Sequence, residues 1–407
     1  MSHRHKHKHN AAAVGGPILT RTFLACLAVF ALSIVVLAWR FVVGLGPTTG
    51  MNDGFPWGIW IAFDVVTGTA LACGGYSVAI LCYALNEGKY HALIRPAVLT
   101  SALGYSLAGA SVIVDLGRYW NVWKIPLIWN WNRNSVLLEV AICIMTYVVV
   151  LWIELSPAFV EVWEKQEKYP LLCRAARRVH GWLNRYLVAI LALGILLPTM
   201  HQSSLGSLML IMTSKLHKLW HTPLLPFLFL ATAVLMGYAA VIFESALANE
   251  VFDRPRETRI LAPLSGIMVG VLFVFLGARL ADLALRGRLA LVAQLDFYSW
   301  MFLLEMALFL GAAILLLSRK RRYNPGVELF SAILIMLGGS LYRFDTFLVG
   351  FQPGPGWSYF PTIPEMAVTI GFVAFEVLLY LFIVKTFPIL HTGVAPHGLE
   401  AAPKPSG

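Results

Sequence analysis

Ten uninterrupted apolar segments run through this sequence, and they limit its possible folds more than any other feature. A helix that rises 1.5 Å per residue needs about 20 apolar residues to cross the ~30 Å hydrocarbon core of a bilayer. The chain is therefore predicted to be all-α, a polytopic membrane helical bundle with about ten transmembrane helices. The expected segments are 19–45, 57–85, 93–117, 134–156, 185–202, 223–248, 261–286, 297–318, 327–350 and 365–390.

Composition excludes three other classes of protein. With 58% hydrophobic and 13% charged residues and a mean hydropathy of +0.73, the chain is too apolar for a soluble domain, in which about a quarter of the residues are charged. A transmembrane β-barrel is excluded because the apolar residues are continuous and do not alternate. A nucleic-acid binder is excluded despite the net charge of +10, because the Lys and Arg residues form short clusters between apolar segments.

Basic residues divide unequally between the two sides of the predicted bundle. If the N-terminus is cytoplasmic, 21 of the 31 Lys and Arg residues face the cytoplasm. Because basic residues gather on the cytoplasmic side of membrane proteins, both termini are predicted to be cytoplasmic. Residues 1–18 are expected to form a disordered His/Lys-rich cytoplasmic tail, 19–390 the transmembrane domain and 391–407 a second cytoplasmic tail.

Three predicted outer connections are rich in aromatic residues, Gly and Pro: 46–58, 117–135 and 351–364. A single Trp in such a loop is most simply read as an anchor at the level of the lipid headgroups. Three such loops on one side favour a docking platform, because large aromatic residues and Arg are enriched in buried protein contacts.

Ionisable residues inside the apolar segments are the strongest indications of function. A charge in hydrocarbon costs several kcal/mol unless a cavity or a partner receives it. Asp64, Glu139 and His201 lie near the outer ends of three predicted helices, and none has an opposite charge at helical spacing in its own segment. Asp115 closes a fourth outer end, and His201 is expected to end its helix.

Two pairs of opposite charges lie at a similar depth. Arg279 and Asp282 are three residues apart on one helix face, and Arg343 and Asp345 lie in the outer half of the ninth segment. Each pair is read either as structural neutralisation between packed helices or as part of the same polar layer.

A polar pocket in the outer third of a helical bundle, rimmed by aromatic residues, fits the head of an amphiphile such as a quinone. The two quinone carbonyls need hydrogen-bond donors, and quinone reduction consumes two protons. Tyr105, near the middle of the third segment, could supply a phenolic donor or could simply pack against a neighbouring helix.

The chain has no recognisable ligands for a redox cofactor of its own. Its five cysteines are single, so they predict neither an iron-sulfur cluster nor a zinc site. A membrane b haem needs paired histidines within facing helices, whereas all eleven histidines lie in predicted helix ends, loops or termini. Electrons are therefore expected to come from another subunit. A haem-bearing cytochrome b and a secondary transporter remain alternatives, although no matched pair of Gly/Pro-broken helices favours the transporter.

Five stretches carry a resemblance to a known family: NDGFPWGIWIAFDVVTGTALACGGY (52–76), RPAVLTSALGYSLAG (95–109), DLGRYWN (115–121), LPTMHQSSLGSL (197–208) and YFPTIPE (359–365). The chain resembles the NrfD/PsrC family of quinone-interacting membrane subunits, and within it the HybB-type branch of Hyb-type nickel-iron hydrogenases. The resemblance spans 44–390, and only the His-rich N-terminus and the variable cytoplasmic loops depart from it.

The resemblance implies a quinone-reactive subunit in the bacterial inner membrane that passes electrons to menaquinone. Its implied partners are a periplasmic ferredoxin-like iron-sulfur subunit, the hydrogenase small and large subunits and the surrounding lipid. The equivalent subunit of another NrfD-type oxidoreductase is the alternative within the family. The resemblance further implies two four-helix bundles, about helices two to five and six to nine, with two flanking helices.

On this interpretation the expected catalytic residues are His201, Asp64 and Glu139, and no metal ligand is expected. The residues expected to bind the quinone are Tyr105, Asp115, Gln202, Ser203, Asn52 and Trp57.

Acidic residues in the apolar segments also predict a proton path. Hydrogen oxidation on the outer face would release protons there, so quinone reduction conserves energy only if its protons come from the cytoplasm. The residues expected to carry them are Glu139, Glu154, Glu244, Glu305 and Glu376. Each of these carboxyls could instead be satisfied by a neighbouring helix for packing alone.

Overall fold

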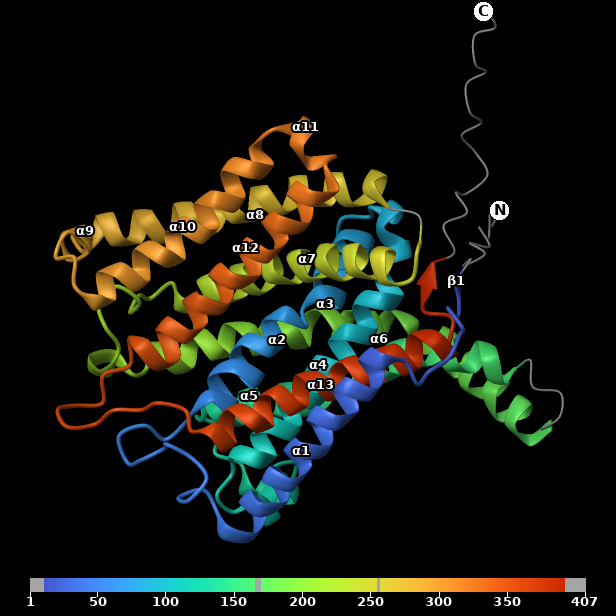
Figure 1. Ribbon diagram of the computed structural model, residues 1–407, viewed down its shortest axis with the longest axis horizontal. Helices are drawn as coiled ribbons and strands as arrows, with labels where there is room; N and C mark the ends of the chain where they lie inside the picture. Colours follow the sequence, from blue (N-terminus) through green and yellow to red (C-terminus); the bar gives the residue numbers. More distant parts are fainter. Residues whose placement is uncertain (1–10, 165–169, 255–256, 392–407) are drawn as a thin grey trace, which may run out of the picture.

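The computed structural model describes residues 11–164, 170–254 and 257–391, and nearly all of its regular structure is helical (Figure 1). Within these residues ten helical spans are long and apolar enough to cross a membrane, which confirms the ten predicted from the sequence. In chain order the elements are β1 (Ala11–Ala12), α1 (Arg21–Val43), η1 (Trp60–Thr67), α2 (Gly68–Leu71), α3 (Gly74–Ala79), η2 (Ile80–Ala84), η3 (Gly88–Leu93), α4 (Ile94–Asp115), η4 (Tyr119–Lys124), η5 (Ile128–Asn130), α5 (Val136–Trp163), α6 (Pro170–Leu210), η6 (Thr213–Lys215), α7 (Leu225–Val251), α8 (Thr258–Leu285), α9 (Leu289–Val292), α10 (Phe297–Leu317), α11 (Arg319–Arg322), α12 (Pro325–Phe344), η7 (Asp345–Val349), α13 (Ile363–Thr386) and β2 (Leu390–His391).

The ten spans form two groups of four with a flanking pair. In the first bundle, the second span (η1 to η2) packs with α4, and α4, α5 and α6 pack in succession. The second bundle consists of α7, α8, α10 and α12, and α1 lies along α13 beside the first bundle (Figure 1). This arrangement matches the predicted two four-helix bundles with two flanking helices.

The two bundles meet where α7 lies against α6 and α3 and where α12 lies against η1. Small residues permit the close approach of α7: a Cβ placed on Gly237 would lie 2.6 Å from the carbonyl oxygen of Cys73. The Ser77 hydroxyl donates a hydrogen bond across the same interface to the carbonyl of Val234 (3.1 Å). Glycine is therefore required at Gly237 for steric reasons.

The second span is an irregular helix. It begins as the π-helix η1 and is interrupted at Ala72 and Cys73, before α3 begins. Threonine hydroxyls in the span bond to its own backbone, from Thr67 to Ala62 O (2.8 Å) and from Thr69 to Val65 O (2.6 Å). Such π-helical segments occur often at functional sites, and this one carries Asp64 and Thr69.

Helix α6 is much longer than the segment predicted over 185–202. It runs from Pro170 to Leu210, so the prediction that His201 ends this helix is wrong. The hydropathy signal stops at the polar run after Met200. The helix continues because the serine hydroxyls of that run donate hydrogen bonds to backbone carbonyls of the same helix. Ser203 bonds to Thr199 O (2.7 Å) and Ser204 to Met200 O (2.7 Å).

Both ends of the described chain lie on one side of the bundle, here called the terminal side. Strand β1 pairs antiparallel with β2, and the backbone N–H of Val14 donates to Val384 O (3.1 Å). Residues 11–18, which the sequence assigns to a disordered tail, therefore lie against the end of α13. Residues 1–10 and 392–407 of the two predicted tails lie outside the described residues.

On the opposite side, here called the loop side, two of the three aromatic loops interlock. Glu365, at the start of α13, accepts hydrogen bonds from the N–H of Gly50 (2.8 Å) and from the hydroxyl of Tyr359 (2.8 Å). Tyr359 in turn accepts from the N–H of Ile59 (2.7 Å). These bonds hold 46–58 and 351–364 together as one unit.

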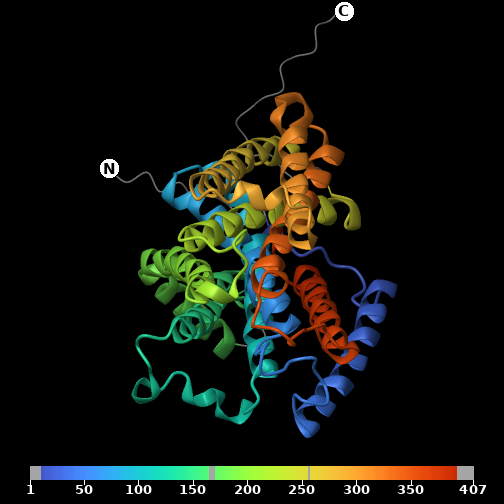
Figure 2. The same cartoon turned by 90° about the vertical axis from the view of Figure 1, so that its left-hand side faces the viewer.

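The third aromatic loop extends separately from the bundle, as the teal segment at the lower edge of Figure 2. Its short helices η4 and η5 leave Trp120, Trp123 and Trp129 between 59% and 80% exposed. This exposure fits either proposed role of the loop, in a lipid headgroup layer or in a protein contact.

The contact at Gly237 yields a testable prediction about stability. A Gly237→Ala substitution forces α7 away from the Cys73 carbonyl, and overpacking of this kind costs about 1–3 kcal/mol. The purified protein should therefore lose its native state at a lower temperature, measured by size-exclusion chromatography after heating in detergent.

The matched control is Gly277→Ala in α8, because a Cβ at Gly277 meets no atom within 4 Å. This variant should be at least as stable as wild type. Equal behaviour of the two variants would show that the bundle interface is not closely packed at Gly237.

Candidate functional site

A polar cluster lies buried in the first bundle, built by three spans. Its members are His201 and Gln202 on α6, Thr69 on α2, Tyr105 on α4 and Cys73 before α3. All five side chains have zero exposure. Three of these residues, His201, Gln202 and Tyr105, are site residues predicted from the sequence, and the structure brings them together.

The hydroxyl of Thr69 organises the cluster. The Nε2 atoms of His201 and Gln202 lie 3.2 Å and 3.0 Å from Thr69 Oγ1. Thr69 uses its only proton on Val65 O, so both nitrogens must donate to it. The His201 ring therefore carries its proton on Nε2, and its Nδ1 is a hydrogen-bond acceptor.

Tyr105 closes the cluster on the α4 side. Its hydroxyl accepts from Gln202 Nε2 (3.2 Å) and lies 3.6 Å from the Cys73 sulfur. Its ring makes edge contacts with the rings of Tyr147, at a centroid separation of 4.6 Å, and of His201, at 5.6 Å. These contacts fix the phenol in a single orientation.

Two polar atoms of the cluster have no hydrogen-bond partner among the described residues. They are His201 Nδ1 and Gln202 Oε1, and both are buried. Leaving such a group unpaired costs about 1–3 kcal/mol, so unpaired buried atoms are informative. Each of these atoms is an acceptor that can receive one hydrogen bond, such as that of a quinol hydroxyl. Once protonated, His201 Nδ1 becomes the donor that a quinone carbonyl needs.

The cluster is closed to solvent and lipid in this conformation. His201 and Gln202 are fully buried, whereas Met200, their neighbour on α6, is 37% exposed. A ligand from the bilayer therefore reaches the two unpaired atoms only through a local displacement of the first-bundle helices.

Asp64 lies on a different side of the second span from the His201 cluster. Its Oδ2 accepts a hydrogen bond from the Thr369 hydroxyl on α13 (3.2 Å), and it also lies beside Ser111 on α4. Asp64 is 8% exposed. It therefore faces the groove between α4 and α13.

Two further acids continue from Asp64 toward the terminal side. Glu376 on α13 interacts electrostatically with both Asp64 and Glu244 of α7. Glu244 lies beside Thr100 and Tyr380, yet Glu244 Oε1 and both hydroxyl oxygens are buried without a hydrogen-bond partner in the described part of the chain. The Glu244 carboxyl and the two neighbouring hydroxyls therefore form a group of unpaired oxygens that a water molecule could bridge.

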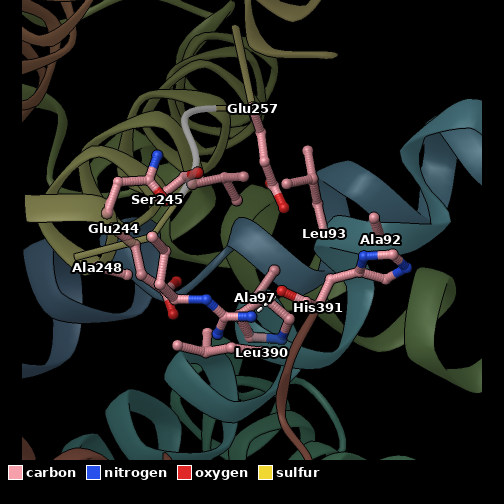
Figure 3. Close-up of a pocket in the computed structure, with 13 residues that line it drawn as sticks. Ala92, Leu93, Ala97, Glu244, Ser245, Ala248, Glu257, Leu390 and His391 are labelled. Carbon is pink, nitrogen blue, oxygen red and sulfur yellow. Dashed lines mark hydrogen bonds between the residues drawn. The ribbon is translucent and has the colours of Figure 1, made fainter. Parts of the chain in front are cut away.

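A cavity of about 30 Å³ opens beside Glu244 on the terminal side, and this is room for water. Figure 3 shows Glu244, Glu257 and His391 around it. The guanidinium of Arg254, which also lines the cavity, donates a hydrogen bond to the backbone carbonyl of His391. Burial raises the pKa of the Glu257 carboxyl, and the charge of Arg254 partly opposes that rise. The cavity therefore joins the terminal side to the first acid of the series.

Other predicted site residues lie apart from the His201 cluster. Glu139 is exposed in the first turn of α5. Ser203 gives its hydroxyl to the backbone of its own helix at Thr199 and Met200. Neither side chain is part of the buried cluster.

Three more predicted residues hold the loop side together. Asn52 donates to Ser358 O (2.9 Å), and the indole of Trp57 donates to Phe347 O (2.9 Å). Asp115, at the end of α4, interacts electrostatically with Arg40 of α1. These contacts give all three a structural role in this conformation.

The remaining predicted acids lie at two other helix contacts. Glu154 of α5 is half-buried against Gly194 of α6. Glu305 of α10 is fully buried in the second bundle, where it pairs with Arg279 of α8 (3.1 Å) and accepts from the Trp220 indole (3.1 Å).

The two charge pairs expected from the sequence are wrong as pairs. Arg279 pairs with Glu305 and not with Asp282, which instead lies 3.9 Å from Arg286 one turn later. Arg343 bonds to backbone carbonyls and not to Asp345. Helix spacing along one segment could not reveal the partners of Arg279 and Arg343, because those partners lie on other helices.

Sequence reasoning missed Thr69, Cys73 and Arg343 as neighbours of the candidate site. Thr69 and Cys73 are small residues within an apolar segment, where a hydroxyl or thiol usually serves packing. One signal in the sequence could have grouped them. Thr69 and Cys73 follow Val66 by three and then four residues, and this spacing places all three on one face of a helix.

The described residues contain no group of three or more His, Cys, Asp or Glu side chains that could hold a metal ion. The described residues also do not fit a b haem. His201 is the only fully buried histidine among them, and its Nε2 is hydrogen-bonded to Thr69. A b haem in a membrane bundle needs a facing pair of axial ligands.

Comparison with known proteins gives a consistent result. Residues 47–352 match the family model described as "Polysulphide reductase, NrfD". The chain is 38% identical over 391 residues to the "Probable Ni/Fe-hydrogenase 2 b-type cytochrome subunit" of Escherichia coli (strain K12), covering 94% of this chain and 95% of that protein. It is 28% identical over 370 residues to the "Menaquinone reductase, integral membrane subunit" of Nitratidesulfovibrio vulgaris (strain Hildenborough), covering 85% and 86%.

The lack of a facing histidine pair among the described residues leads to a spectroscopic prediction, which tests the cytochrome name of the Escherichia coli relative. The subunit purified in detergent from haem-sufficient cells should show no Soret band and no α-band after reduction with dithionite. A stoichiometric Soret band that His201→Ala removes would contradict this prediction.

Proposed function

The chain belongs to the NrfD family, and from this premise we propose that it is the quinone-reactive membrane subunit of a respiratory nickel-iron hydrogenase. In this role it passes electrons from an iron-sulfur partner to a quinone, with menaquinone as the favoured species. The names of the two relatives support this, one a hydrogenase 2 subunit and the other a menaquinone reductase subunit.

One observation carries the proposal at the level of chemistry. Buried His201 Nδ1 and Gln202 Oε1, on consecutive residues of α6, have no hydrogen-bond partner among the described residues, and an amphiphile from the bilayer would reach them after a local displacement of the first-bundle helices. A quinone needs a polar partner for its ring oxygens and a nearby proton donor. His201 supplies both functions, because Thr69 fixes its tautomer and leaves Nδ1 free to take up and release a proton.

The proposed complex places its catalytic partners on the loop side, which is periplasmic in this proposal. These partners are a ferredoxin-like iron-sulfur subunit and the hydrogenase small and large subunits. Support comes from the interlocked loops 46–58 and 351–364, on which Trp357 and Phe360 are 46% and 80% exposed. Large exposed aromatic side chains on a rigid surface are typical anchors of protein contacts.

Quinone reduction also needs protons, and we propose that the chain conducts them from the terminal side, which is cytoplasmic in this proposal. Oxidation of one H₂ releases two protons and two electrons at the partner, and the quinone takes up two electrons and two protons. The proposed route is the cavity beside Glu257, then Glu244, Glu376 and Asp64, and a last transfer past the second span must connect Asp64 to the His201 cluster. Water or hydroxyls must bridge the gaps, because proton transfer requires hydrogen-bond contact.

The proposed role of His201 predicts a selective loss of activity. In the purified complex, His201→Ala should lower hydrogen-dependent quinone reduction by about 100-fold or more, because general acid–base groups contribute about 10²–10⁴-fold. Hydrogen-dependent reduction of a viologen dye, which bypasses the membrane subunit, should stay unchanged.

The control variant is Ser203→Ala, two residues along the same helix, whose hydroxyl bonds only to its own backbone. It should retain both activities. If His201→Ala lowered dye reduction as much as quinone reduction, His201 would be an assembly residue and the proposed site would be wrong.

The proposed proton route makes a second prediction, measured in vesicles that enclose a pH-sensitive dye. With the hydrogenase partners outside, hydrogen-driven quinone reduction should make the lumen more alkaline, because protons leave it through the chain. Glu376→Gln should reduce this lumenal signal at least about tenfold, together with quinone reduction.

Glu328→Gln provides the matched control for this experiment. Glu328 is also a buried carboxyl, but it belongs to α12 in the second bundle and accepts from Ser265 (2.9 Å). This variant should leave the lumenal signal unchanged. An unchanged lumenal pH in wild type during rapid quinone reduction would exclude the route, while the quinone site would remain.

A further inference from the structure

Arg343 is a fully buried arginine at the contact between the two bundles. It lies in the last turn of α12 in the second bundle, and its side chain has zero exposure. Helix α12 packs at this point against η1 of the first bundle and against α7. The guanidinium thus lies between helices of both bundles.

Neutral groups hold the guanidinium in place. Nη1 donates to Val66 O (3.0 Å), and Nη2 donates to Phe229 O (2.9 Å) and to the Thr232 hydroxyl (3.3 Å). The ring of Phe229 lies 4.7 Å from the guanidinium carbon. Arg343 Nε is buried and has no partner among the described residues.

No carboxylate forms an ion pair with Arg343 within the described part of the chain. Arg279, the comparable arginine of α8, does pair with one, at Glu305. A buried charge without a counter-charge is costly, and an arginine cannot escape that cost by losing its proton. The site around Arg343 is therefore electropositive and favours a negative charge nearby.

The candidate quinone site is the place where such a charge would arise. Arg343 acts electrostatically on His201, Tyr105 and Cys73. The geometry agrees, because Arg343 binds the carbonyl of Val66, and Thr69, one helical turn later, binds His201. The charge of Arg343 thus reaches the cluster from the side of the second bundle.

We propose that Arg343 is the fixed positive charge of this site and stabilises negative charge on the ring oxygens of the quinone as it is reduced. The inference rests on the proposed quinone site and adds to it a residue from the other bundle. Electrons reach the ring before both protons have been delivered, so negative charge gathers on its oxygens. A preorganised cation in a low-dielectric interior lowers the energy of that charge without rearrangement.

Arg343 is carried by α12 of the second bundle and is held by a carbonyl of η1 in the first bundle and one of α7 in the second. Arg343 is a positioning residue in this scheme, because it acts through the electric field and has no assigned contact with the ligand.

The experiment compares two tailed naphthoquinone analogues that differ in charge. A 2-hydroxy-3-alkyl-1,4-naphthoquinone is anionic at neutral pH, and its 2-methoxy counterpart is neutral. Dissociation constants are measured by calorimetry on the complete complex in nanodiscs. Wild type should bind the anion more tightly than the neutral analogue. Arg343→Gln should raise the dissociation constant of the anion at least about tenfold and that of the neutral analogue by less than about threefold.

Two variants separate the charge from its contacts. Arg343→Lys keeps the positive charge and should retain most of the preference for the anion. Thr232→Val removes one hydrogen bond of Arg343 while leaving the charge, and it should preserve the preference as well.

Each possible result bears on the inference. If Arg343→Gln weakened the binding of both analogues equally, the role of Arg343 would be structural. That result would overturn the inference but not the proposed quinone site. If Arg343→Gln does not assemble, wild type alone decides, because tighter binding of the neutral analogue would also overturn the inference. Failure of wild type to bind either analogue would overturn the proposed quinone function itself.

Discussion

The absence of water inside a membrane bundle is the constraint on which this structure depends. Every polar group there must find its partner within the protein. The threonines of the second span and the serines of α6 meet this requirement by bonding to their own backbone. Arg279 and Glu305 meet it in part by pairing across two helices, although Arg279 Nε and Glu305 Oε1 have no hydrogen-bond partner among the described residues. Much of the architecture, including the long α6 and the irregular second span, follows from such local solutions.

The places where this constraint is not met are the most informative. Among the buried atoms without partners in the described residues are His201 Nδ1 and Gln202 Oε1 of the first bundle and Arg343 Nε at the contact between the bundles. Unpaired buried atoms reduce stability, so a site that keeps several of them is prepared for a ligand. The first bundle supplies acceptors and a proton carrier, and the second supplies a positive charge.

The same reasoning distinguishes acids that serve structure from acids that could move protons. Glu365 accepts hydrogen bonds from Gly50, Tyr359 and Thr362, which fixes the loop side. Glu244 and Glu376 lie near other acids, and Glu244 Oε1 has no hydrogen-bond partner among the described residues. Only the second kind keeps the spare hydrogen-bonding capacity that a proton carrier requires.

The sequence by itself determined the ten spans and, through the family resemblance, the two bundles, and it predicted as site residues His201, Gln202 and Tyr105, which the structure brings together. It could do so because a bilayer imposes span length and apolar composition on each helix separately. Only the tertiary structure decided that α6 continues past His201, that Thr69 fixes the tautomer of His201, and that Arg279 pairs with Glu305 and not with Asp282. The continuation of α6 depends on serines that bond to their own backbone, which hydropathy does not register. The other two outcomes depend on contacts between different helices, and the spacing of residues within one segment carries no information about them.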